Sequence, residues 1–199
     1  MNWDLALEIA GFVIGIIYLW YEYHANPLMW LASVIMPCIS LWIYWRKGLY
    51  ADFGINIYYL AIAVYGYIIW TVGGHGKRKQ KRTRAITAMP AWAWAAGTGA
   101  FLILWAAIGW WLVNFTDSNV PWNDAFTTAL SIVALWMLAR KYLEQWLAWI
   151  VVDAVCVGLY VYKGIYFYAC LYAIYTVIAV FGYRKWRGMM QNMQKTIAD

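Results

Sequence analysis

Long apolar stretches alternate with short polar or basic breaks along the whole chain. A helix needs about 20 apolar residues to cross a bilayer, with a range of about 17–25. Seven stretches have that length, and none shows the period-2 alternation of strands. The pattern therefore predicts an all-α integral membrane protein with seven transmembrane helices. Their expected ranges are 5–22, 28–45, 51–71, 90–113, 123–140, 144–162 and 165–183.

The chain also repeats itself. Residues 30–70 and 146–186 align at a constant offset of 116 without a gap, with 14 identities in 41 positions. Weaker matches at the same offset extend the similarity back to the first predicted helix. Each copy then holds three helices, and a fourth joins them, so both copies insert in the same direction. The sequence predicts one membrane domain, residues 1–199, built as parallel 3+1+3 repeats. Repeat one covers about 5–71, the linker helix about 90–113 and repeat two about 123–186.

Composition agrees with a polytopic membrane protein. The chain is 65% hydrophobic and 12% charged, whereas soluble domains are roughly 45–50% apolar and about 25% charged. With 199 residues there is room for one membrane domain and little else. Cys38, Cys156 and Cys170 all fall in apolar stretches. We expect them to be buried structural residues, neither disulfides nor metal ligands.

The basic residues indicate an orientation. With the N-terminus outside, the predicted cytoplasmic segments hold twelve Lys and Arg residues and the outer segments hold three. This positive-inside bias predicts an outer N-terminus and a cytoplasmic C-terminus. The basic run from Lys77 to Arg82 is also a pattern found in nucleic-acid-binding segments. We interpret it as a topology signal near anionic lipid, so no nucleic acid is expected as a partner.

One acid lies far from any predicted helix end. Asp153 is about nine residues from either end of its stretch, or about 13 Å, and an ionisable group at that depth costs several kcal/mol. Trp146, Trp149 and Asp153 are spaced so that they share one helix face. Indole faces beside a carboxylate suit a flat cation, because a desolvated cation–π contact contributes about 2 kcal/mol. The alternatives are a structurally satisfied Asp153 and an interfacial Trp146.

Other predicted helices carry polar or aromatic faces as well. Such faces are expected to converge on a substrate site at the repeat interface. Helix–helix hydrogen bonding and plain packing are the alternatives for them. Pro37, the repeat partner of Asp153, is either a hinge or a static kink. The further candidate contacts are Asn56, Tyr59, Thr127, Thr128, Ser131, Tyr172 and Tyr175.

Motifs of catalysis are absent from the sequence. No nucleophile–base pair, HExxH motif or Walker A loop appears. The sequence therefore predicts no catalytic residue, no metal, no cofactor and no use of ATP. An integral-membrane enzyme and a receptor-like or scaffolding bundle stay as alternatives from other classes. The repeat favours transport by alternating access around a site in the middle of the membrane.

Three stretches resemble the PnuC-type vitamin transporters, and the resemblance covers nearly the whole chain. It implies a bacterial inner-membrane protein with a fold similar to SWEET sugar transporters, passive uptake of nicotinamide riboside and a homotrimer. It also implies that a cytoplasmic kinase traps the product and that Trp146 and Trp149 line the vitamin site. The stretches are 49–59, 124–141 with its end Leu138-Ala139-Arg140-Lys141, and 144–166, which begins Glu144-Gln145-Trp146-Leu147-Ala148-Trp149.

The chain departs from this family at one position. Typical nicotinamide riboside members have Asn where this chain has Asp153. Relatives that are similar to thiamine carriers share the fold, and thiamine also has a flat cationic ring and an aminopyrimidine that can donate to a carboxylate. Nicotinamide riboside is the first expected substrate and thiamine the alternative.

Overall fold

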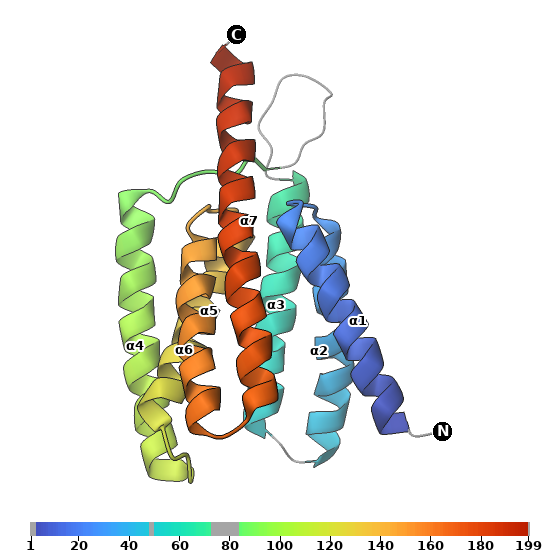
Figure 1. The fold of residues 1–199 in the computed structure, drawn as a ribbon, viewed down its shortest axis with the longest axis vertical. Helices are drawn as coiled ribbons and strands as arrows, with labels where there is room; N and C mark the ends of the chain where they lie inside the picture. Colours follow the sequence, from blue (N-terminus) through green and yellow to red (C-terminus); the bar gives the residue numbers. More distant parts are fainter. Residues whose placement is uncertain (1–2, 48–49, 73–83, 199) are drawn as a thin grey trace. The chain divides into compact units, whose positions relative to one another are not determined.

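The computed structural model describes residues 3–47, 50–72 and 84–198, which form seven helices (Figure 1). The chain divides into two compact units, Met1–Ala85 and Ile86–Asp199. The all-helical class predicted from the sequence is confirmed.

The first unit contains three helices, and the middle one packs against both others. Its core is built by α2 and α3, where Met29, Trp30, Ala63 and Trp70 are buried. The helices are α1 (Trp3–Tyr23), α2 (Leu28–Lys47) and α3 (Tyr50–Val72).

The second unit contains four helices, each packed against the next along the chain. The helix expected to link the repeats belongs to this unit, because it packs against the helix that follows it. A short extended segment precedes it, and Thr87 pairs there with the turn between the next two helices. The helices are α4 (Ala91–Phe115), α5 (Pro121–Ala139), α6 (Gln145–Tyr162) and α7 (Tyr166–Ala198).

The turn between the first two helices of each repeat has the same geometry in both units. Ala25 and Lys141, 116 positions apart, both have a left-handed backbone, with φ of 51° and 59°. The Ala25 N–H donates to the Glu22 carbonyl at 2.9 Å, and the Lys141 N–H donates to the Leu138 carbonyl at 2.8 Å. In both turns the next N–H reaches back five residues, at 2.9 and 3.0 Å. Helix ends closed in this way fix the exit angle of the chain.

A cluster of two tryptophans and a glycine also occurs in both units. The Trp30 ring packs against Gly66 and meets the Trp70 ring edge-to-face, with centroids 5.8 Å apart and an interplanar angle of 89°. The second unit repeats the cluster 116 positions later, at 5.7 Å and 86°. Its members are Trp146, Gly182 and Trp186. The identities of the sequence repeat therefore mark packing positions shared by the two units.

Four helices among the described residues are long and apolar enough to cross a membrane: α3, α4, α6 and α7. The helix α7 continues to Ala198, whereas the apolar stretch ends near residue 183. Its 33 residues extend about 50 Å, more than the roughly 30 Å hydrocarbon core. The predicted range ended near residue 183 because it was based on hydropathy. The helix continues beyond the apolar part, since backbone hydrogen bonding does not require apolar side chains.

The cysteines correct one expectation. All three thiols are free, and Cys156 is buried as predicted, but Cys38 and Cys170 are exposed. In a membrane protein an apolar helix face can lie toward lipid, so an apolar stretch does not imply that each of its residues is buried.

Candidate functional site

Asp153 lies midway along α6, at a position where its side chain is only 6% exposed. The carboxylate lies close enough to Cys156 on α6, and to Tyr172 and Tyr175 on α7, to act on them electrostatically. No cation and no hydrogen-bond donor pairs with it among the described residues. A buried carboxylate without a partner is costly, and a bound cation would lower that cost.

Tyrosine rings form a wall beside this carboxylate, where α6 packs against α7. The Tyr160 ring stacks on the Tyr172 ring, with centroids 5.2 Å apart and an angle of 16°, and on the Tyr168 ring at 5.3 Å. Tyr172 meets Tyr175 edge-to-face at 5.8 Å. The structure thus brings together three predicted contacts, Asp153, Tyr172 and Tyr175. The wall offers both aromatic faces and hydroxyl groups to a ligand.

Three side chains in the first turns of α6 carry buried polar atoms without a hydrogen-bond partner in the part of the chain that the structure describes. These atoms are the Nε1 groups of Trp146 and Trp149 and both amide atoms of Gln145, which is fully buried. A buried donor or acceptor left in this state costs about 1–3 kcal/mol. The Trp146 ring is enclosed by Gly182 and Trp186. Trp30 is enclosed in the same way in the first unit. The buried position of Trp146 is therefore accounted for by packing between α6 and α7, without a ligand.

Gln145 is not among the contacts predicted from the sequence. Gln145, Trp149 and Asp153 follow one another at intervals of four residues and form a stripe along α6. The corresponding residues in α2 are Met29, Ser33 and Pro37. The two units therefore differ along one stripe, where the second unit has side chains able to bind polar groups. Comparison of Met29 with Gln145 in the sequence repeat was the signal that could have identified it.

The predicted contacts on α5 have local hydrogen bonds. The Thr127 hydroxyl donates to the Asn123 carbonyl at 3.2 Å, and the Thr128 hydroxyl donates to the Asp124 carbonyl at 2.8 Å. Both hydroxyls can still accept a hydrogen bond from a ligand. Ser131, the third predicted contact on this helix, is half-buried.

The candidates in the first unit lie on α2 and α3. Asn56 is buried, and Tyr59 is 36% exposed with its ring 6.0 Å from that of Tyr58. Pro37 is buried inside α2, which continues through it from Leu28 to Lys47 without a break. A continuous helix is compatible with either a hinge or a static bend at Pro37.

An ion pair joins the start of α5 to the turn between α6 and α7. Lys163 Nζ lies 3.0 Å from Asp124 Oδ1, and the Ser118 hydroxyl donates to Asp124 Oδ2 at 2.8 Å. The two charged side chains are 32% and 31% exposed, so water screens the pair.

Loss of this ion pair should change stability only slightly. For Lys163→Met and Asp124→Asn, singly and together, we expect a coupling of about 0.2–1 kcal/mol, the usual value for exposed pairs. Thermal unfolding of the four purified proteins in detergent measures it as a double-mutant cycle. A coupling above about 2 kcal/mol would show that the pair is better shielded from water than its exposure indicates.

These features define a class of protein: a multi-pass helical membrane protein with a cluster of polar and aromatic side chains on α6 and α7. The family whose sequence model matches residues 5–188 is described as nicotinamide mononucleotide transporters. The chain belongs to this family, which includes the PnuC-type proteins, and the resemblance predicted from the sequence is confirmed. Its members are transporters of the bacterial inner membrane and not enzymes.

Individual relatives agree with this assignment. The nicotinamide riboside transporter PnuC of Escherichia coli strain K12 is 25% identical over 210 residues, covering 93% of this chain and 87% of that protein. The riboflavin/roseoflavin transporter RibM of Streptomyces davaonensis is 26% identical over 187 residues, covering 90% and 83%. A crystal structure of the vitamin B3 transporter PnuC has a TM-score of 0.69 at 22% identity, covering 96% and 84%, which shows a shared fold.

Proposed function

We propose that this protein takes up a cationic vitamin, with nicotinamide riboside as the first candidate, by alternating access and without ATP. The observation that carries the proposal is the Asp153 carboxylate, which is buried and has no cationic partner among the described residues. The family is one of vitamin transporters, and the E. coli relative is named for nicotinamide riboside. The positively charged pyridinium ring of that vitamin is the chemical partner that the carboxylate lacks.

The substrate contacts follow from the residues around this carboxylate. The pyridinium pairs with Asp153 and lies against the Trp149 ring, and the tyrosine wall contributes Tyr172 and Tyr175. Gln145 lies two helical turns from Asp153, about 12 Å along the axis, and offers its amide to polar groups at the far end of an extended ligand. The remaining proposed contacts are Trp146, Asn56, Tyr59, Thr127, Thr128 and Ser131, with Pro37 as the hinge candidate.

Thiamine is the second candidate. Its thiazolium ring is also a flat cation. Its aminopyrimidine can donate a hydrogen bond to a carboxylate, and this bond is stronger than the one that the neutral amide of Asn would accept. Riboflavin, the ligand in the name of the RibM relative, is neutral. It therefore gains no charge pairing from Asp153.

The duplicated turns and Trp–Gly clusters support the finer architecture that we propose. In it, seven transmembrane helices form parallel 3+1+3 repeats similar to SWEET transporters, with the N-terminus outside and the C-terminus cytoplasmic. Twelve Lys and Arg residues on the cytoplasmic side, against three outside, support this orientation. From the resemblance to PnuC-type transporters we further propose that the protein forms a homotrimer. We also propose that a cytoplasmic kinase phosphorylates the vitamin and so prevents its escape.

Uptake into proteoliposomes tests the function. We expect saturable uptake of radiolabelled nicotinamide riboside at micromolar concentration, with no ATP and no ion gradient, and weaker uptake of thiamine. Protein-free liposomes give the background. If thiamine is preferred, the second candidate is correct. If riboflavin alone is transported, the protein is functionally similar to RibM, and if no vitamin is bound or transported at micromolar concentration, the proposal fails.

A further inference from the structure

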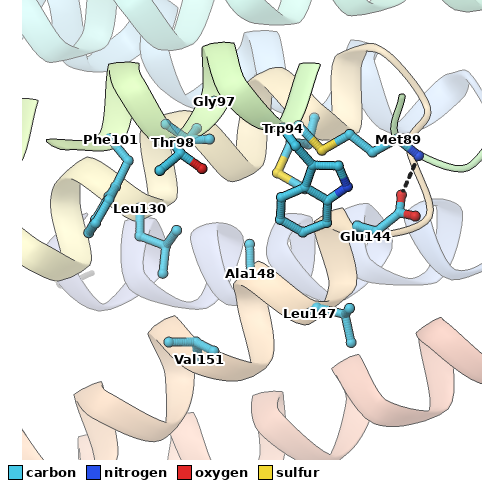
Figure 2. Close-up of a pocket in the computed structure, with 12 residues that line it drawn as sticks. Met89, Trp94, Gly97, Thr98, Phe101, Leu130, Glu144, Leu147, Ala148 and Val151 are labelled. Carbon is cyan, nitrogen blue, oxygen red and sulfur yellow. Dashed lines mark hydrogen bonds between the residues drawn. The ribbon is translucent and has the colours of Figure 1, made fainter. Parts of the chain in front are cut away.

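A pocket lies in the second unit between α4, α5 and α6 (Figure 2). Its volume is about 240 Å³ and its walls are almost entirely apolar. One end is formed by Met89, Trp94 and Glu144, and the other contains Phe101 and Leu130 (Figure 2). The pocket thus has a polar end and an apolar end.

The polar end contains a carboxylate that has no basic partner among the described residues. Glu144 Oε2 accepts a hydrogen bond from the Met89 backbone N–H at 2.9 Å (Figure 2), and none of the described Lys and Arg residues pairs with Glu144. The protein has a net charge of +6, so cations are plentiful in its sequence. A carboxylate lining an apolar pocket, beside the ring of Trp94, is suited to an ammonium group.

The turn between α5 and α6, which holds Glu144, also carries a basic side chain, Arg140, near the start of α4. The Arg140 guanidinium is placed over the Trp92 ring, 5.6 Å from its centroid, and Arg140 precedes Glu144 by four residues in the α5–α6 turn. Guanidinium groups bind phosphate well. The turn therefore carries an acidic side chain that lines the pocket and a basic side chain close to it in sequence.

Exposed tryptophans place this end of the pocket at the membrane surface. Trp92 and Trp94, in the first turn of α4, are 56% and 47% exposed, as expected for the aromatic belt at head-group level. From there the pocket continues along α4 past Gly97 toward Phe101, in the direction of the hydrocarbon core. Its chemistry changes in the same order as that of a phospholipid, from head group to acyl chain.

We propose that this pocket binds one phospholipid whose head group carries a primary ammonium, namely phosphatidylethanolamine. The ammonium pairs with Glu144, the phosphate lies toward Arg140, and one acyl chain occupies the apolar part against Val151 and Leu130. The bound lipid joins α4 to α5 and α6 from the membrane side. This site is independent of the vitamin and does not rest on the proposed function.

Native mass spectrometry of the full-length protein with defined lipids tests the proposal. The wild type should retain phosphatidylethanolamine about tenfold better than phosphatidylglycerol, which has no ammonium group. Glu144→Gln keeps an acceptor for the Met89 N–H but removes the charge, and should abolish this preference; a tenfold loss corresponds to about 1.4 kcal/mol. Asp117→Asn, which removes an exposed carboxylate elsewhere, is the matched control and should keep it.

A second variant examines the acyl-chain part. Val151→Phe fills the pocket and leaves Glu144 in place, so it should reduce retention of phosphatidylethanolamine while vitamin affinity stays unchanged. Equal retention of both lipids by the wild type, or an unchanged preference in Glu144→Gln, overturns the proposal. If Val151→Phe or Glu144→Gln instead changes the oligomer mass without changing lipid retention, the pocket is a contact between copies of the chain and the proposal is wrong.

Discussion

Replacement of Asp153 by Asn should weaken the binding of a cationic vitamin by tenfold or more, which is about 1.4 kcal/mol. The two side chains have nearly the same size and both accept hydrogen bonds, so the change removes charge and little else. Because Asp153 is 6% exposed, water screens its charge weakly, and loss of the ion pair should be felt in full. Isothermal titration of the purified protein with nicotinamide riboside and with thiamine measures the effect.

The matched control is Asp124→Asn, which removes the same charge from the ion pair with Lys163 at the start of α5. It should leave affinity within twofold, because Asp124 already has a cationic partner. The affinity for a neutral vitamin should be the same in the wild type and in Asp153→Asn. If Asp153→Asn binds nicotinamide riboside and thiamine as tightly as the wild type, the carboxylate has a structural role and the cation site must lie elsewhere.

Much of the fold could be predicted because helices of a membrane protein are long and apolar. The beginnings of the described helices agree with the predicted ranges within about two residues, which is the ordinary uncertainty of helix boundaries. The end of α7 at Ala198 was missed because hydropathy reports contact with lipid and not backbone conformation. Cys38 and Cys170 were expected to be buried for a related reason, since apolarity does not distinguish the lipid-facing side of a helix from the protein-facing side.

Those features of the candidate site that depend only on the position of a residue along one helix could be predicted from the sequence. The depth of Asp153 and its shared face with Trp149 follow from helical spacing. The enclosure of Trp146 by Gly182 depends instead on how α6 packs against α7, and the pairing of Glu144 with Met89 joins residues 55 positions apart. Spacing within one helix carries no information about either contact, so the apolar pocket beside Glu144 could not be predicted from the sequence.

Replacement of Gly182 by Ala should destabilise the folded protein. A Cβ at this position would lie 2.6 Å from Cη2 of the Trp146 ring and 2.7 Å from two further ring atoms. The ring cannot move aside easily, because Trp146 is 2% exposed and is held edge-to-face by Trp186. Overpacking of this kind costs about 1–3 kcal/mol. Thermal unfolding in detergent should therefore show a Tm several degrees lower.

Gly158→Ala in α6 is the matched control, since a Cβ there meets no atom within 4 Å. That variant should be as stable as the wild type or slightly more so, because Ala favours helix over Gly by about 0.5–1 kcal/mol. Gly66→Ala should resemble Gly182→Ala, since the ring of Trp30 occupies the equivalent space in the first unit. Equal Tm values for Gly182→Ala and Gly158→Ala would contradict the packing described for Trp146.

The same variant separates two roles for Trp146. If this ring only holds α6 against α7, Gly182→Ala should lower Tm while the fraction that stays folded binds the vitamin with unchanged affinity. If the ring also contacts the vitamin, its displacement by the new Cβ should weaken binding as well, and Gly66→Ala should not, because Trp30 belongs to the unit that lacks the Gln145–Trp149–Asp153 stripe. Titration of both alanine variants below their Tm therefore tests whether Trp146 is a substrate contact or a packing residue.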